Sequence, residues 1–337
     1  MQEFELLANI FKTNNSLPSS VSIPPGDDMG AIRLGDQEIL ITVDQVADGV
    51  HFLLEQTDLK RIARKAVTRN LSDVAAMGAA PLGAVCAINF PKPFSSSDAQ
   101  TLLTHIREVG QSFNCPIIGG DISAWHGKLI ITITIFAHMP QTHGSPILRS
   151  TALAGDGIYV TGPLGGSLIN HNNHIHHLDF EPRLDIANHL AQEQGSHRPH
   201  AMIDLSDGLA RDAAHIATLS NLTLQIHASK LPISQAAQIA SQSTSNPTWQ
   251  HAISDGEDYE LLFTADPEAW GTATTQYHGH TITHIGTVAP KQQSPIMLTL
   301  PDGSTNTLGA DNPTSGADMQ NHSEQQGGNQ YGWEHTT

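Results

Sequence analysis

The chain has 337 residues, of which 16 are basic and 33 acidic, so its formal net charge at pH 7 is −17. Domains usually hold about 100 to 200 residues, so this length predicts two domains. A chain this acidic repels phosphate backbones and anionic lipid surfaces, which argues against nucleic acid and membranes as partners.

The cysteines and the N-terminus indicate a cytoplasmic protein. Cys86 and Cys115 form no CxxC pair, so neither a zinc site nor a disulfide framework is expected. The first residues, MQEFELLANIF, carry acids where a signal peptide carries bases, and no apolar run approaches about 18 residues. These features predict a location in the reducing cytoplasm.

Short apolar runs alternate with helical patterns over residues 1–140. Buried strands are expected at 39–43, 82–90 and 129–137. Apolar residues recur at helical spacing over 59–78 and again from Leu102 to Phe113. We therefore expect residues 1–140 to form a mixed α/β domain.

A stretch rich in Pro and Gly follows and indicates a connector. A second α/β domain is expected over 150–300, with strands at 158–162, 222–226, 259–264 and 282–288 and a helix after Ser206. Residues 301–337 are polar and rich in Gly, Asn, Ser and Gln, which predicts a flexible tail.

Acidic residues and one asparagine lie beside small residues, most of them where the predicted elements end. The candidates are Asp27, Asp28, Asp44, Asn70, Asp73, Asp121, Asp204, Asp207, Asp255, Glu257 and Asp258. Such residues are also common caps and turn formers, so for any one of them a structural role is as well supported as a functional one. If several converge in one cleft, their repulsion requires counterions. Mg²⁺ with a polyphosphate is the natural choice, because it prefers hard oxygen ligands.

Phosphate binding must use something other than the familiar nucleotide motifs, because the sequence has no Walker A motif and no kinase HRD or DFG set. Glycine clusters occur at 119–120 and 162–166, but each is more often a plain turn. Arg149 lies in the connector of a chain with few bases, which favours a role as a phosphate ligand over a role as a plain surface residue.

Histidines are numerous, and the densest run contains His171, His174, His176 and His177. Its polar, Asn-rich surroundings favour a solvated loop over a transition-metal site. Cys86 falls within a strand pattern, which favours packing over reactivity.

Seven motifs together carry a family resemblance: GDD (26–28), TVDQVADGVHF (42–52), NLSDVAAMGAAP (70–81), GGD (119–121), GDGIYVTGPLG (155–165), IDLSDGL (203–209) and DGEDYELLFT (255–264). In this order and spacing they resemble the thiamine-monophosphate kinase family, part of the superfamily of aminoimidazole ribonucleotide synthetase and selenide water dikinase. The resemblance spans roughly residues 3–290. It implies two α/β domains of the aminoimidazole ribonucleotide synthetase-like type, with mixed sheets flanked by helices.

The resemblance also implies an activity, a homodimer formed through the N-terminal domains, and site residues. The activity is transfer of a phosphoryl group from ATP to thiamine monophosphate, which gives thiamine diphosphate. The implied Mg²⁺ ligands are Asp28, Thr42, Val43, Asp44, Asp73, Asp121, Asp204 and Asp207. The implied ATP contacts are Gly120, Asp121, Arg149 and Ser206, and the implied thiamine contacts are His51, Glu257 and Trp333. For Asp27 two roles stay open, metal ligation and turn formation.

No catalytic base is expected among these residues. The acceptor is a phosphate monoester with a second pKa near 6, so it is already largely ionised at pH 7. The aspartates are therefore interpreted as metal ligands and not as proton carriers. Three rival hypotheses stay open: another ATP-using enzyme of the superfamily, a non-catalytic Mg-nucleotide sensor, and a metal-storage protein that uses the histidine run.

Overall fold

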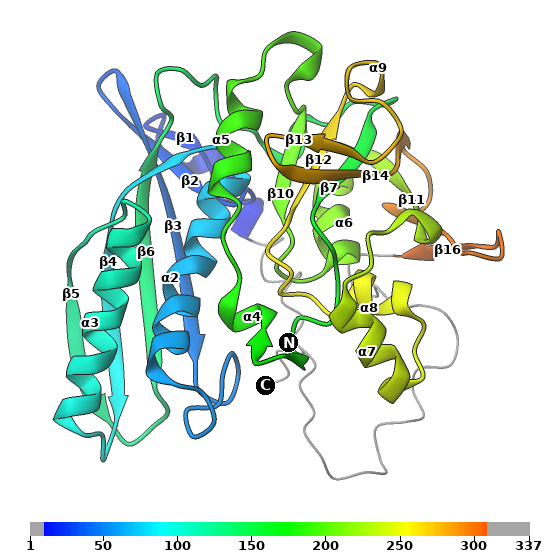
Figure 1. Cartoon of the computed structure of the whole chain (residues 1–337). Coiled ribbons are helices and arrows are strands. Elements are labelled where there is room, and N and C mark those ends of the chain that lie inside the picture. The colour runs from blue at the N-terminus through cyan, green and yellow to red at the C-terminus, as the bar shows by residue number, and fades with distance from the viewer. Residues whose placement is uncertain (1–9, 309–337) are drawn as a thin grey trace. The chain divides into compact units, whose positions relative to one another are not determined.

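The computed structural model describes residues 10–308, which divide into two compact units (Figure 1). Residues 16–146 and 172–192 form the N-terminal unit, and residues 10–15, 147–171 and 193–308 form the C-terminal unit. The sequence predicts a boundary between residues 140 and 150, and the chain divides at 146/147. The expected second domain includes residues 172–192, whereas these residues pack with the first unit.

The N-terminal unit contains a six-stranded sheet of order β1-β2-β3-β6-β4-β5. Only the pair β4 and β5 is parallel. The strands are β1 (Val21–Ile23), β2 (Gly30–Leu34), β3 (Gln37–Ala47), β4 (Ala80–Pro91), β5 (Ile117–Trp125) and β6 (Ile130–His138). β5 therefore forms one edge of this sheet.

Helices α2 (Leu59–Ala76) and α3 (Ser96–Ser112) lie side by side against this sheet (Figure 1). α2 begins at Asp58, whose side chain accepts a hydrogen bond from the backbone N–H of Arg61, as an N-cap does. Alternate residues of β6 are buried, and twelve residues of α2 are buried as well. The buried face of α2, which has helical spacing, and the buried face of β6, which has two-residue spacing, thus pack into one core. The unit ends with β9 (His174–Ile175), α4 (His176–Asp179) and α5 (Leu184–Gln192).

The C-terminal unit contains an eight-stranded sheet of order β10-β12-β7-β14-β11-β15-β16, with β13 paired to β14. Its strands are β7 (Gly157–Thr161), β10 (Ala201–Asp204), β11 (Leu222–His227), β12 (Leu261–Ala265), β13 (Thr275–Tyr277), β14 (His280–Pro290), β15 (Ile296–Thr299) and β16 (Thr305–Leu308). The short strand β8 (Asn170–His171) lies outside this sheet.

One apolar core occupies the face of this sheet that α6 (Leu209–Leu219) covers. Ile158 and Val160 of β7 and Leu224 and Ile226 of β11 point into it, as the alternation of a strand requires. The other helices are α7 (Gln235–Thr244), α8 (Thr248–Ser254) and α9 (Pro267–Trp270). Single 3-10 turns are η1 (Asn14–Ser16), η2 (Arg149–Thr151), η3 (Gly195–His197) and η4 (Ala228–Lys230).

Two expectations about local structure are wrong. Gly119 and Gly120 lie within β5 and not in a turn, since both pair with residues of β4. Residues 305–308 form β16, paired with β15, although the sequence placed them in the flexible tail. β-Branched residues at 296–307 supply enough strand propensity for a short hairpin at the sheet edge.

Among residues 10–308, no helix is long and apolar enough to cross a bilayer.

Candidate functional site

Asp28 and Asp73 bring two carboxylates together in the N-terminal unit. Asp28 precedes β2 and Asp73 lies on α2, and each offers a carboxylate oxygen within 4.8 Å of the other. Asp28 is buried, with 8% of its surface exposed. The hydroxyl of Thr42, on β3, donates to Oδ2 of Asp73 at 2.5 Å. The structure therefore unites three of the predicted metal ligands.

Asp44 lies two residues further along β3, so its side chain is on the same face as that of Thr42. Its backbone N–H donates to Oδ1 of Asn70 at 2.8 Å, and its carboxylate pairs with Nε of Arg69 at 3.0 Å. Asn70 is fully buried and donates to the carbonyl of Ala66. Arg69 and Asn70 lie about one helical turn before Asp73 on α2. Their side chains thus hold the C-terminal part of β3 against α2.

Arg69 is a site residue that the sequence interpretation did not single out. Its signal was a base directly before the NLSDVAAMGA motif, in a chain with few bases. By pairing with Asp44, Arg69 offsets part of the negative charge of this acidic group.

The other predicted residues of this unit lie in different places. Val43 is 59% exposed on the opposite face of β3. Gly120 and Asp121 lie on β5, which β6 and β4 separate from β3. Three strand spacings of about 4.8 Å place them roughly 14 Å from β3. Within one copy of the described chain, the carboxylate pair of Asp28 and Asp73 does not extend to Asp121.

His51 follows β3 and is buried. Its Nδ1 accepts a hydrogen bond from the backbone N–H of Ala47 at 3.1 Å. An accepting Nδ1 carries no proton, so the ring is the neutral tautomer with its proton on Nε2. His51 is thus oriented as a hydrogen-bond donor.

In the C-terminal unit, the loop between β10 and α6 carries Asp204, Ser206 and Asp207. Asp204 is 2% exposed at the end of β10, whereas Asp207 is exposed. The loop is held by Asp212, whose Oδ2 accepts the backbone N–H groups of Asp207 at 3.2 Å and Gly208 at 3.0 Å.

Burial raises the pKa of Asp212 well above its usual range, and the negative charges of Asp207 and Asp204 raise it further. Arg149, on η2, and the N–H of Gly208 lower it in part. Arg149 is therefore close enough to act on this acidic loop, as a phosphate-binding candidate should be. Sequence reasoning missed Asp212, although an acid in the first turn of a helix is a recognisable signal.

Glu257 is 3% exposed in the segment before β12. Its backbone N–H donates to the carbonyl of Ser206 at 2.8 Å, which ties the predicted thiamine contact to the predicted ATP contact. Burial raises the pKa of the neighbouring Asp258 well above its usual range, and the charges of Asp255, Glu260 and Glu257 raise it further. The N–H of Gly165 opposes this shift.

The glycine cluster at 162–166 does not offer its central amides to a phosphate. The N–H of Gly165 donates to Oδ1 of Asp258, and the N–H of Gly166 donates to Oδ2 of Asp255, each at 2.7 Å. Carboxylates of the chain itself thus occupy the donors that a phosphate cradle would need.

The histidine run is more ordered than the expected solvated loop. His174 begins β9, and His176 and His177 begin α4. Nδ1 of His177 lies 2.7 Å from Nζ of the buried Lys65 on α2. In the described part of the chain the run forms no group of three metal-ligating side chains.

Two remaining predictions have different outcomes. Cys86 is buried on β4, which confirms the expected packing, and burial raises the pKa of its thiol to about 11, which disfavours the reactive thiolate. Trp333 lies outside the described residues.

The donor set of the N-terminal unit fits a hard divalent cation. Asp28, Asp73 and Thr42 present only oxygen atoms, which Mg²⁺ and Ca²⁺ prefer and which softer metals do not. Two carboxylates are the number that Mg²⁺ commonly takes when phosphates supply further ligands.

Comparisons with known proteins agree along most of the chain. The AIR synthase related protein N-terminal domain family matches residues 26–139, and the corresponding C-terminal domain family matches residues 154–298. A thiamine-monophosphate kinase of Rhodopirellula baltica is 36% identical over 294 residues, covering 85% of this chain and 89% of that protein. The thiamine-monophosphate kinase of Haemophilus influenzae is 33% identical over 289 residues, covering 80% of this chain and 83% of that protein.

Solved structures give the same result. AaThiL complexed with AMPPCP and TMP has a TM-score of 0.74 at 26% identity, covering 90% of this chain and 94% of that one. Thiamine monophosphate kinase from Aquifex aeolicus has a TM-score of 0.71 at 25% identity, covering 91% and 99%. The expected two-domain α/β fold is thereby confirmed, and the chain belongs to the thiamine-monophosphate kinase family of AIR synthase related proteins.

Proposed function

We propose that the protein transfers the γ-phosphoryl group of MgATP to thiamine monophosphate and so makes thiamine diphosphate. The observation that carries this proposal is the carboxylate pair of Asp28 and Asp73 with Thr42, in a chain 36% identical to a thiamine-monophosphate kinase. AMPPCP and TMP, the ligands named for AaThiL, are a nucleotide analogue and the proposed acceptor.

The reaction needs positioning and charge neutralisation more than proton transfer. The phosphate of thiamine monophosphate is already largely ionised at pH 7, so its oxygen attacks without a general base. Bound Mg²⁺ would neutralise the developing charge on the phosphoryl oxygens and hold the two polyanions together. No residue is therefore assigned as a catalytic base.

The roles proposed for the chain's own residues follow from the family resemblance. Asp28, Thr42, Val43, Asp44, Asp73, Asp121, Asp204 and Asp207 would bind Mg²⁺, with Val43 acting through its backbone oxygen. Gly120, Asp121, Arg149 and Ser206 would contact ATP, and His51 and Glu257 would contact the thiamine group. The neutral His51 would donate from Nε2, and Glu257 would offer a negative charge to the thiazolium cation.

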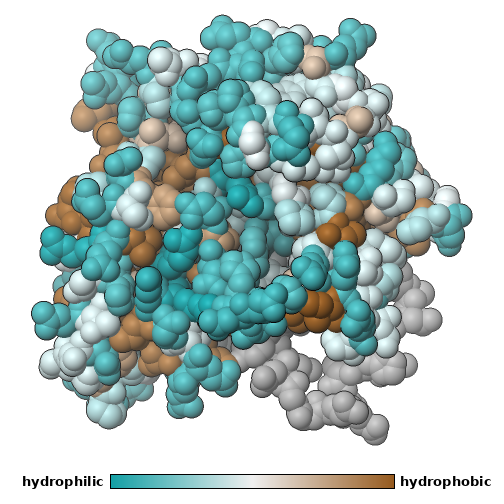
Figure 2. Space-filling view, viewed as in Figure 1, coloured by the Kyte–Doolittle hydropathy of each residue, from teal (hydrophilic) through white to brown (hydrophobic). Residues whose placement is uncertain are grey.

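We also propose a homodimer formed through β5 of the N-terminal unit. Eight of its nine residues are exposed, although the strand carries Ile118 at 69%, Ile122 at 57% and Trp125 at 45% exposure. Figure 2 shows hydrophobic surface on the side of this unit where β5 lies. An exposed apolar edge strand is a ready site for strand pairing, and a second copy of the chain would cover it. The predicted cytoplasmic location is kept as part of this proposal.

An assay with several acceptors tests the function. Purified protein is incubated with ATP, Mg²⁺ and, in parallel, thiamine monophosphate, thiamine or no acceptor, and the products are separated by chromatography. Thiamine diphosphate should form only with thiamine monophosphate. ATP binding by calorimetry without turnover of any acceptor would instead identify a nucleotide sensor.

A further inference from the structure

The segment from Asp255 to Glu260 links two parts of the proposed site. The N–H of Glu257 donates to the carbonyl of Ser206, and the N–H of Tyr259 donates to the carbonyl of Leu205, each at 2.8 Å. The N–H of Leu205 returns a hydrogen bond to the carbonyl of Glu260. Any shift of this segment therefore moves both Glu257 and the Ser206 loop.

The backbone of the segment is held in an unfavourable conformation. Glu257 and Tyr259 have positive φ angles of 54° and 50°, which side-chain-bearing residues rarely adopt. Such strain persists only where surrounding contacts impose it. The contacts that fix the segment are thus part of what places Glu257.

The glycine turn at 162–167 supplies these contacts. The N–H groups of Gly165 and Gly166 donate to Asp258 and Asp255, and the hydroxyl of Ser167 donates to the carbonyl of Gly256 at 2.7 Å. Gly166 has a φ of 74°, and a Cβ there would lie 2.4 Å from the backbone of Ala236. The turn therefore packs directly against the backbone of α7, with no room for a side chain at Gly166.

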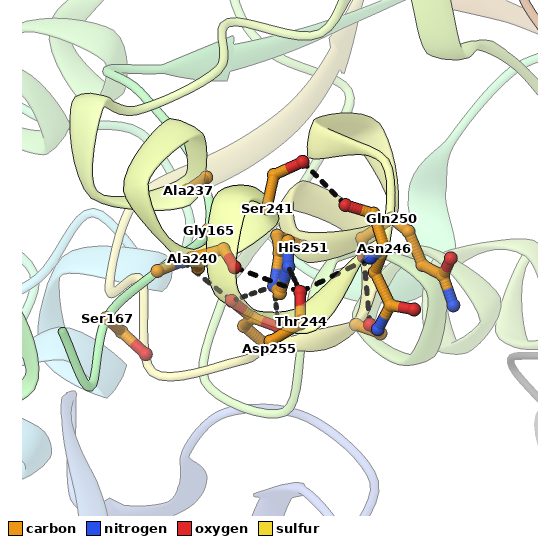
Figure 3. Close-up of polar contacts among 12 residues, drawn as sticks. Gly165, Ser167, Ala237, Ala240, Ser241, Thr244, Asn246, Gln250, His251 and Asp255 are labelled. Atoms are coloured by element: carbon orange, nitrogen blue, oxygen red, sulfur yellow. Dashed lines mark hydrogen bonds and ion pairs between the residues drawn. The ribbon is translucent and has the colours of Figure 1, made fainter. Parts of the chain in front are cut away.

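His251 on α8 holds the carboxylate of Asp255, which accepts the N–H of Gly166. Its Nδ1 lies 3.0 Å from both oxygens of Asp255, and its Nε2 lies 2.8 Å from Oγ1 of Thr244 (Figure 3). Because carboxylate oxygens only accept, the proton in the contact with Asp255 sits on Nδ1. The ring is 6% exposed, so water competes little for these contacts.

Thr244 in turn is fixed at the end of α7. Its hydroxyl donates to the carbonyl of Ala240 at 3.0 Å and accepts the N–H of Asn246 at 3.3 Å. The imidazole is therefore anchored on one side by α7 and presented to Asp255 on the other. All of these residues belong to the C-terminal unit.

We propose that His251 is a positioning residue: by fixing the carboxylate of Asp255 against the N–H of Gly166, it sets the position of the Asp255–Glu260 segment and hence of Glu257 toward substrate. Its effect on catalysis rests on the proposed function, whereas its effect on the Gly166 hydrogen bond does not. His251 touches no substrate group in this account and acts only through Asp255.

The primary test measures amide hydrogen exchange at Gly166 by NMR. His251→Leu removes the donor to Asp255, and we expect exchange at Gly166 to speed up about tenfold, the effect of losing one charge-assisted hydrogen bond. His251→Asn keeps a donor near the Nδ1 position and should restore most of the protection. Unchanged exchange at Gly166 in a folded His251→Leu protein would overturn the proposal.

His105→Leu is the matched control, because Nδ1 of His105 also lies 3.0 Å from a carboxylate, that of Glu108, but in the N-terminal unit. It should leave Gly166 unaffected. If His251→Leu does not fold, Asp255→Ala is used instead. It removes the carboxylate that accepts from the N–H of Gly166, and it should speed up exchange at Gly166 at least as much. Protection that survives in Asp255→Ala would also overturn the proposal.

The kinetic test separates positioning from general stability. His251→Leu should raise the KM for thiamine monophosphate about tenfold, with a smaller change in kcat, and His251→Asn should rescue it. A lower melting temperature with unchanged KM would overturn the link to substrate. If wild-type protein makes no thiamine diphosphate, the proposed function fails, and the exchange result at Gly166 still decides the role of His251.

Discussion

Asp73 combines a structural contact with a proposed metal contact. Its Oδ2 accepts the hydroxyl of Thr42, and its carboxylate lies within 4.8 Å of that of Asp28. At that distance two carboxylate charges repel by about 3.5 kcal/mol at an effective dielectric constant of about 20. A bound cation would remove this repulsion. The pair therefore lowers the stability of the metal-free protein and raises its affinity for a cation.

Asp73→Asn should therefore separate stability from metal binding. The amide oxygen still accepts from Thr42, but one of the two charges is gone. We expect the melting temperature in EDTA to be unchanged or raised, and the rise in melting temperature with MgATP to be lost. Thermal unfolding with and without MgATP measures both, and a full Mg-dependent rise in the variant would contradict the assignment.

The sequence located these acids through their motifs and through the helical spacing of Asn70 and Asp73. It could not show what Arg69 and His251 act on, because each acts through a contact that only the folded chain creates. Arg69 meets Asp44 across 25 residues, and the link from His251 through Asp255 reaches Gly166 across 89. Side-chain partners at such separations follow from strand order and helix packing, which a single sequence does not encode locally.

Among the elements, β5 differs most from its sequence interpretation. Two consecutive glycines and a mostly exposed pattern concealed a strand, since neither matches the buried alternation of β6. Gly120 is required there by a close approach to β4. A Cβ at Gly120 would lie 1.8 Å from the carbonyl oxygen of Cys86.

Gly120→Ala should consequently disturb the pairing of β4 and β5. Because backbone and not a flexible side chain blocks the added methyl group, we expect a loss of about 1 to 3 kcal/mol in the free energy of unfolding. Urea unfolding measures it. Gly119→Ala is the control, since the nearest atom to a Cβ there is 3.7 Å away. Equal stability of the two variants would contradict this explanation of Gly120.

The apolar edge of β5 gives a second prediction at this scale. Ile122→Lys places a charge on the surface that a second copy is proposed to cover, and it should shift the protein from dimer to monomer. Leu34→Lys changes a still more exposed apolar residue, on β2, and should leave the dimer intact. Sedimentation velocity measures the mass of each variant, and a wild-type monomer or a dimeric Ile122→Lys would contradict the interface.

For the whole molecule, the division into two α/β units was predictable from composition and from the alternation of strands and helices. The assignment of residues 172–192 was not. That segment follows strands of the second domain along the chain, yet its Asp179 pairs with Arg61 of α2 at 2.9 Å. Sequence order cannot show that the chain returns to the first unit.

Buried histidine makes the stability of the molecule depend on pH. His284 on β14 is 5% exposed, and burial lowers its pKa, as do the nearby charges of Lys230 and His227. The unfolded chain therefore takes up a proton on this residue before the folded chain does. This contribution to stability is complete above the unfolded pKa of about 6.5 and is lost as the pH falls below it.

His284→Leu should reduce that loss. Between pH 7 and pH 5, the free energy of unfolding of the wild type should fall more steeply than that of the variant, by at most about 1.4 kcal/mol per pH unit. The exposed His126→Leu serves as control and should keep the slope of the wild type. Parallel urea-unfolding slopes for wild type and His284→Leu would contradict the protonation argument.

The initial rate of thiamine diphosphate formation as a function of Mg²⁺ concentration tests whether Asp28 and Asp73 hold the Mg²⁺ that phosphoryl transfer needs. With saturating ATP and thiamine monophosphate, the wild-type rate should rise from zero in EDTA to a plateau. The Asp73→Asn rate should stay at least about 100-fold lower, or should need far more Mg²⁺. A wild-type rate that is independent of Mg²⁺, or an Asp73→Asn variant as fast as the wild type at every concentration, would contradict the account.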